Sequence, residues 1–111
     1  MTNRHFDIIS PREAYAAYML GSVLVDVRTS SEIEKKAINL KSLKKIPFEE
    51  LEQRVSELPA NRKVVFFSRV GVKGQEAAKI LSRYGFEDVA MVEGGITAWE
   101  EEGLPVSKTS N

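Results

Sequence analysis

The chain is organised around one stretch, VVFFSRVGVKGQEAA at residues 64–78. It begins with four apolar residues that favour a buried parallel strand, and it ends in the apolar spacing of an amphipathic helix. When such a strand runs through a tight loop into a helix, the loop amides and the positive end of the helix dipole converge on one point. The sequence therefore predicts an anion site in the loop, with the hydroxyl of Ser68 facing into it.

The rest of the chain alternates between strand and helix patterns. Two helix starts carry capping boxes, Ser10 with Glu13 and Thr29 with Glu32, in which side chain and backbone exchange hydrogen bonds. From residue 37 a loop is predicted to lead into a short strand, and the tail from Ser107 is predicted to be disordered. The predicted strands cover 6–9 at one edge, 23–27, 44–46, 64–67 and, as the last, 88–92. The predicted helices cover 11–20, 30–36, 47–58, the segment from the loop to 84, and the segment from 95 to about 102.

This alternation predicts one α/β domain over residues 1–111, with a core at about 9–106 and a mostly parallel sheet of about five strands between two helix layers. In such sheets the ligand site lies beyond the carboxyl ends of the strands. Three polar strand ends fall there: Asp26 to Arg28, Ser68 to Lys73, and Glu93 to Gly95. We expect them to meet at one edge of the sheet.

Composition excludes several kinds of function. Lys plus Arg is 16 and Asp plus Glu is 16, so the formal net charge is zero, and no basic field predicts binding to nucleic acid or membrane. The absence of cysteine excludes disulfides, thiolate metal sites and thiol catalysis, and a single His5 excludes a histidine cluster. We therefore expect no metal and no cofactor. No signal-peptide pattern opens the chain and no apolar run is long enough to span a bilayer, so the expected location is cytoplasmic.

These elements, with their strand-end motifs, resemble the rhodanese-like (sulfurtransferase) domain over roughly residues 9–106. The resemblance implies a three-layer fold and places Ser68 where the family carries its nucleophilic cysteine, in a loop of the form C-R-x-G-x-R. That cysteine attacks a sulfur donor such as thiosulfate and holds the sulfur as a persulfide. Lys73 replaces the usual arginine, Gly74 replaces a small polar residue, and the family's G-H-I-x-G-A segment matches at 36–41 only in Ile38. The matching motifs are LVDVR at 24–28, IPFEEL at 46–51, EGGITAW at 93–99 and GLPV at 103–106.

A serine at this position changes the predicted chemistry. A cysteine at a helix amino end becomes a thiolate near neutral pH, whereas a serine hydroxyl needs an adjacent general base. Sulfur transfer by this sequence is therefore not expected, and neither is cysteine-phosphatase chemistry. The backbone amides remain, so a small oxyanion such as sulfate, phosphate or thiosulfate is the expected ligand. The predicted anion loop is Arg69, Val70, Gly71, Val72 and Lys73, and the predicted supporting residues are Asp26 and Arg28, either as a structural pair or as a brace for the loop.

Three hypotheses follow for function. The leading one is a non-catalytic, regulatory module that binds an anion or a protein partner at the former active site. The second is a thiosulfate or persulfide sulfurtransferase whose cysteine at position 68 has been replaced by serine. The third is a scaffold whose helices pair with another chain. The five lysines between Lys35 and Lys45 are either a solvated face or a docking face for an acidic partner.

Overall fold

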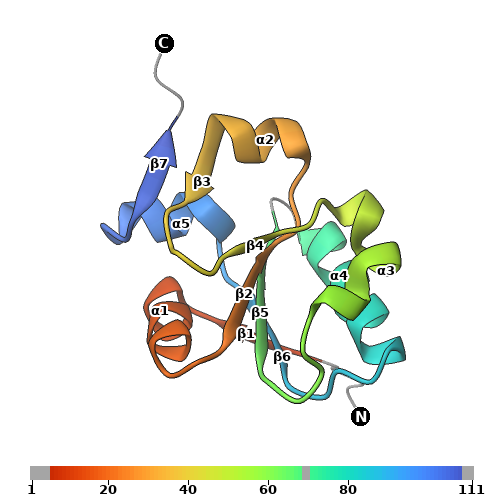
Figure 1. The fold of residues 1–111 in the computed structure, drawn as a ribbon. Helices are drawn as coiled ribbons and strands as arrows, with labels where there is room; N and C mark the ends of the chain where they lie inside the picture. The colour runs from red at the N-terminus through yellow and green to blue at the C-terminus, as the bar shows by residue number, and fades with distance from the viewer. Residues whose placement is uncertain (1–5, 69–70, 109–111) are drawn as a thin grey trace.

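A five-stranded parallel sheet forms the centre of the protein (Figure 1). The computed structural model describes residues 6–68 and 71–108. The strand order is β1–β6–β5–β2–β4, and every neighbouring pair is parallel. β5 therefore lies in the middle of the sheet and β1 at one edge, as the sequence predicts. The strands are β1 (Asp7–Ile9), β2 (Val23–Asp26), β4 (Lys44–Lys45), β5 (Val64–Phe67) and β6 (Val89–Val92).

Helices cover both faces of this sheet, which confirms the predicted three-layer α/β class. On one face α1 (Pro11–Met19) lies beside α5 (Gly95–Glu101). On the other face α3 (Leu51–Arg54) lies beside α4 (Gly71–Arg83). The short helix α2 (Ser30–Lys35) follows β2 and lies near the carboxyl ends of the strands (Figure 1).

The central strand supplies side chains to two separate cores. All four residues of β5 are buried, and successive side chains point to opposite faces of a strand. Val64 and Phe66 belong to the core under α3 and α4, while Val65 and Phe67 belong to the core under α1 and α5. In the second core the Trp99 ring meets Phe67 edge-on at 5.3 Å, and its indole N–H donates to the carbonyl oxygen of Pro105 at 2.8 Å. Trp99 is thus a core residue that also fixes the chain after α5.

The predicted helix starts are confirmed in detail. Ser10 Oγ accepts from the backbone N–H of Glu13, and the Glu13 carboxylate accepts from the Ser10 N–H at 2.8 Å. Thr29 and Glu32 make the same reciprocal pair at the start of α2. Gly21, after the end of α1, has φ +105°, a conformation that favours glycine.

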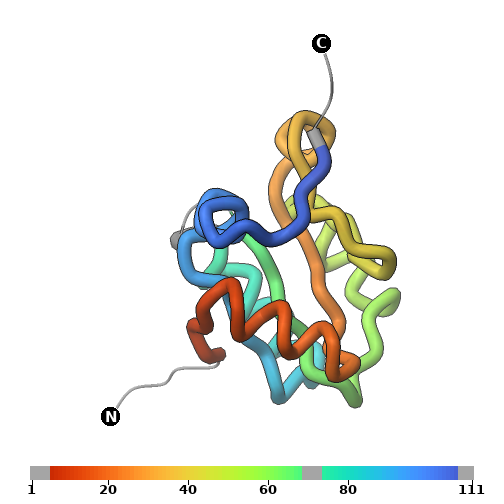
Figure 2. Tube along the Cα trace, turned by 90° about the vertical axis from the view of Figure 1, so that its left-hand side faces the viewer, coloured from red at the N-terminus to blue at the C-terminus, as the bar shows by residue number. Residues whose placement is uncertain are grey.

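A second, two-stranded sheet was not predicted. β3 (Lys36–Ile38) pairs antiparallel with β7 (Val106–Lys108), and the two run side by side in Figure 2. The prediction of a loop from residue 37 is therefore wrong at its start, and the prediction of disorder is wrong for residues 107 and 108. Strand 88–92 is also not the last strand. Each of these strands is short and its partner is about 70 positions away, so local pattern gives no signal. Residues 109–111 lie outside the described residues.

The predicted helix at 47–58 exists only in pieces. A 3-10 turn at Phe48–Glu50 leads into α3, and a second 3-10 turn follows at Val55–Glu57. No side chain caps any of these segments. The apolar spacing is nevertheless confirmed, since Leu51, Val55 and Leu58 are all buried. Across the described residues, no helix combines the length and apolar character needed to cross a membrane.

Candidate functional site

Ser68 directly follows the central strand, and its side chain is buried, with 6% of its surface exposed. α4 begins at Gly71, so the helix starts earlier than the amphipathic pattern suggested, and the backbone of Gly71, Val72 and Lys73 forms its first turn. The N–H groups of a first helical turn have no partner within the helix and point toward its amino end. The predicted loop residues Arg69 and Val70 lie outside the described residues. The anion-binding role assigned to residues 69–73 stays a prediction.

Met91 forms one wall of this position. The Ser68 hydroxyl lies 3.9 Å from Met91 Sδ, a weak acceptor. A Cβ atom at Gly74 would lie 2.1 Å from the same sulfur and 2.9 Å from Ser68 Oγ, so the glycine is what lets the Met91 side chain approach. The sequence pattern does not predict this contact of Met91. Gly74 stands where the resemblance implies a small polar residue, which signals space at this position but not the neighbour that fills it.

The turn after β6 also lies against Ser68, at its backbone carbonyl group. Gly95, at the start of α5, has φ +58°, and a Cβ atom there would lie 2.5 Å from the Ser68 carbonyl oxygen. Gly94 also has a positive φ, of +76°. The strand end at Glu93 to Gly95 therefore does meet Ser68 at the carboxyl edge of the sheet, as the sequence predicts.

Asp26 and Arg28 form a buried ion pair at the end of β2. Arg28 Nη2 donates to Asp26 Oδ2 at 2.8 Å, Arg28 Nε donates to Oδ1 at 3.0 Å, and the Arg28 backbone N–H donates to Oδ1 at 3.1 Å. Arg28 Nη2 also donates to the carbonyl oxygen of Lys36 at 2.6 Å, which ties β2 to β3. Val27, which lies between Asp26 and Arg28 in the sequence, donates its backbone N–H to the Phe67 carbonyl oxygen at 2.9 Å. The ion pair and this hydrogen bond together hold the end of β2 against the residue before Ser68.

The chemistry open to this site is limited. The chain has no cysteine, and its single histidine, His5, lies outside the described residues. A thioether beside the Ser68 hydroxyl is not a base that could remove its proton. In residues 6–68 and 71–108, no three His, Asp or Glu side chains gather in a way that could hold a metal ion.

The chain belongs to the rhodanese-like domain family, whose sequence model matches residues 10–102. A sulfurtransferase of Allochromatium vinosum is 36% identical over 84 residues, which cover 76% of this chain and 77% of that protein. The thiosulfate sulfurtransferase GlpE of Vibrio cholerae is 32% identical over 87 residues, 75% of this chain and 76% of its own. The solution structure of the polysulfide-sulfur transferase homodimer from Wolinella succinogenes superposes with a TM-score of 0.83 at 29% identity, covering 96% of this chain and 82% of that one. The predicted resemblance is confirmed, and the chain is related to sulfurtransferases.

Proposed function

We propose that this chain is a rhodanese-like module that does not transfer sulfur and that binds a small oxyanion at the amino end of α4. One observation carries the proposal: the position that follows the central strand is Ser68, in a chain that contains no cysteine. Persulfide chemistry needs a thiolate, and the hydroxyl of serine stays protonated near neutral pH. An oxygen–sulfur adduct on an activated serine would also be unstable.

The anion site does not depend on the side chain at position 68. Its donors are backbone N–H groups in the first turn of α4, a helix of 13 residues, and these remain whether the residue before them is cysteine or serine. Lys73 adds a positive charge within the predicted loop. Sulfate, phosphate and thiosulfate fit this donor set, and a protein partner with an acidic or phosphorylated group would use the same donors.

A second candidate is a sulfurtransferase whose cysteine at position 68 has been replaced by serine. The surroundings of the site favour it, because the Asp26–Arg28 pair and the close approach of Gly95 are both present and do not require a serine. The source gene decides between the two: a cysteine codon at position 68 supports this candidate, and a serine codon removes it.

Thiosulfate titration, followed through backbone amide chemical shifts at low ionic strength, tests the oxyanion site. We expect saturable shifts at Gly71 and Gly74. Replacing Lys73 by Gln should weaken binding about tenfold, because a charge-assisted contact is worth about 1.5 kcal/mol. Lys79→Gln is the matched control: it removes the same charge from the exposed side of α4, and binding should change by less than about twofold. Absence of saturable shifts, or equal weakening by both variants, would contradict the oxyanion site.

A further inference from the structure

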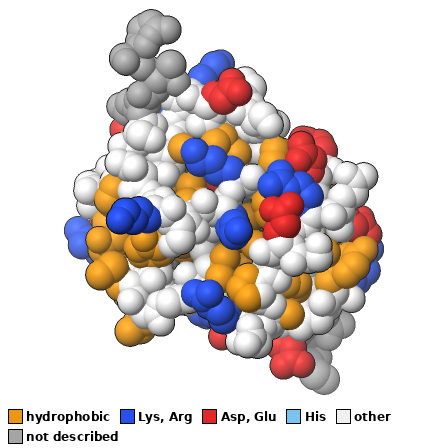
Figure 3. Space-filling model, in the orientation of Figure 1, with side chains coloured by type: hydrophobic (Ala, Val, Ile, Leu, Met, Phe, Trp, Pro, Cys, Tyr) orange, Lys and Arg blue, Asp and Glu red, His pale blue; other side chains and the backbone are white. Residues whose placement is uncertain are grey.

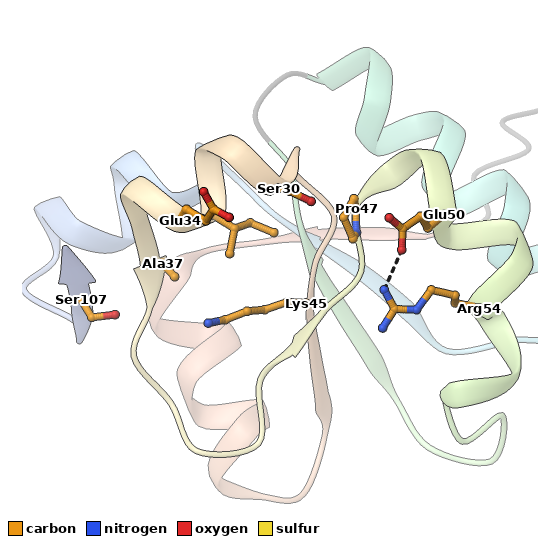
Figure 4. Close-up of a pocket in the computed structure, with 9 residues that line it drawn as sticks. Ser30, Glu34, Ala37, Lys45, Pro47, Glu50, Arg54 and Ser107 are labelled. Atoms are coloured by element: carbon orange, nitrogen blue, oxygen red, sulfur yellow. Dashed lines mark hydrogen bonds and ion pairs between the residues drawn. The ribbon is translucent and has the colours of Figure 1, made fainter. Parts of the chain in front are cut away.

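A separate cavity of about 450 Å³ opens beside β4 (Figure 4). It lies between α2, β3 and β7 on one side and β4 with the following 3-10 turn and α3 on the other. Its volume is within the range of small-ligand sites, about 300–1,000 Å³. Ser68 is not among the described residues that line it, and none of those lining residues comes from β5 or α4. Its lining includes Ser30, Ile33, Ala37, Lys45, Pro47 and Ser107, together with the carboxylates of Glu34 and Glu50.

The fold itself creates this cavity. β4 is only two residues long, so the edge of the main sheet ends early. The small β3–β7 sheet stands apart from that edge and faces it with two small side chains, Ala37 and Ser107, which are directly paired in the antiparallel register. Ile33, Ala37 and Pro47 are buried and give the cavity an apolar lining, while the hydroxyls of Ser30 and Ser107 add hydrogen-bonding groups.

Lys45 lines the cavity, and its ammonium group is available to pair with an anionic ligand. Figure 4 shows its side chain running toward Ala37 and Ser107, on the opposite side of the cavity from Ser30 and Glu34. Within the described part of the chain its ammonium group has no ion pair and no hydrogen bond.

The other cation of the lining is already engaged. Arg54 donates to Glu50 at 2.9 Å and to Glu57 at 2.8 Å. The hydrogen bond from Arg54 holds the pKa of the Glu57 carboxyl below its usual value, so this group stays ionised and keeps the guanidinium occupied. Among the described residues that line the cavity, Lys45 therefore supplies the one positive charge that an incoming anion finds without an ion partner.

The segment of residues 35–45 beside the cavity is basic, although the whole chain is neutral and two carboxylates, Glu34 and Glu50, also line the cavity. Residues 35–45 contain five lysines and no acidic residue. One of them, Lys36, is paired with Glu100 at 2.5 Å. Figure 3 shows separate Lys and Arg side chains spread over this face, with hydrophobic side chains between them and some Asp and Glu side chains beside them. The lysines of the 35–45 segment that are unpaired within the described residues raise the local concentration of anions near the cavity.

We propose that this cavity binds a small organic acid, a molecule with one carboxylate, sulfonate or phosphate group on an apolar body. The acidic group pairs with Lys45 and accepts a hydrogen bond from the hydroxyl of Ser107, on the side of the cavity away from the Glu34 carboxylate. The apolar body packs on Ile33, Ala37 and Pro47. An inorganic oxyanion lacks this body, so the site is independent of the one proposed at α4, and either can fail without the other.

The probe 8-anilinonaphthalene-1-sulfonate, an aromatic sulfonate, tests this site through backbone amide chemical shifts. We expect saturable shifts at Ile33, Ala37, Lys45 and Ser107 that excess thiosulfate does not reverse. Lys45→Gln should weaken binding about fivefold or more, since the charge-assisted contact is lost. Lys41→Gln removes a neighbouring lysine that does not line the cavity, and it should change the affinity less than about twofold.

A second variant fills the cavity without changing charge. Ser107→Phe should abolish probe binding while the urea midpoint of unfolding stays within error, because position 107 is exposed at the rim. If this variant does not fold, the two lysine variants decide the question. Equal weakening by Lys45→Gln and Lys41→Gln would overturn the proposal in favour of general charge attraction. Shifts centred on Met19 and Leu20, the most exposed large apolar side chains described, would overturn it too.

Discussion

Replacing Asp26 by Asn is expected to lower the free energy of unfolding by about 3–5 kcal/mol, the usual cost of breaking a buried ion pair from one side. Asp26 is fully buried, and Arg28 is 6% exposed. The carboxylate accepts four hydrogen bonds from Arg28, three from the guanidinium and one from the backbone. The variant leaves the Arg28 charge buried, facing a neutral amide.

The matched control for this prediction is an exposed pair. Arg12 and Glu102 are 2.7 Å apart, and their side chains are 71% and 44% exposed. Arg12→Gln should cost less than about 1 kcal/mol, since water and salt screen exposed pairs. Urea unfolding of both variants against the parent measures the difference. A loss at Asp26→Asn no larger than that at Arg12→Gln would show that the buried pair does not hold β2 in place.

Gly95→Ala is the second large prediction, with an expected loss of about 2–5 kcal/mol in the free energy of unfolding. Two costs add here. An alanine at φ +58° is strained by about 1–2 kcal/mol. Its Cβ would also lie 2.5 Å from the Ser68 carbonyl oxygen, and relieving that overlap requires backbone movement, which costs about 1–3 kcal/mol.

Gly103→Ala separates these two costs. Gly103 also has a positive φ, of +79°, but nothing lies within 4 Å of a Cβ atom built there. It should therefore show the strain alone, about 1–2 kcal/mol. Equal losses of unfolding free energy in the two variants would mean that Gly95 does not closely contact the Ser68 carbonyl oxygen. A larger loss in Gly95→Ala, with shifted amide resonances around Ser68, would support the close approach.

The main sheet and the helix starts were predictable because their signals are local. The buried run of β5 and the capping boxes at Ser10 and Thr29 are each encoded within a few residues. The Asp26–Arg28 pair was also recognised, because an acid at the end of an apolar strand needs a partner. Pairing between β3 and β7 could not be predicted, since three-residue strands have no periodicity to detect and each depends on a partner far along the chain.

The residues that surround the site were harder to predict from the sequence than the position of the site itself. Ser68 and the turn at Gly95 follow from strand ends that meet at one edge of a parallel sheet. The contact of Met91 with Ser68 depends on the missing side chain at Gly74, and sequence alone does not say which neighbour fills that space. The cavity at Lys45 could not be predicted either, because it results from the gap between a short edge strand and the separate β3–β7 sheet.

The most direct test of the whole account is a thiosulfate-to-cyanide sulfur-transfer assay on the parent chain, Ser68→Ala and Ser68→Cys together. We predict that the parent gives no turnover above Ser68→Ala, because neither residue forms a thiolate. Ser68→Cys should gain turnover, since the helix start, the Asp26–Arg28 pair and the Gly95 contact do not depend on the side chain at 68. Failure of Ser68→Cys in a folded protein would mean that other changes near the site, such as Gly74, have also removed the chemistry. Turnover by the parent above that of Ser68→Ala would contradict the central claim that Ser68 leaves this rhodanese-like domain without sulfur transfer.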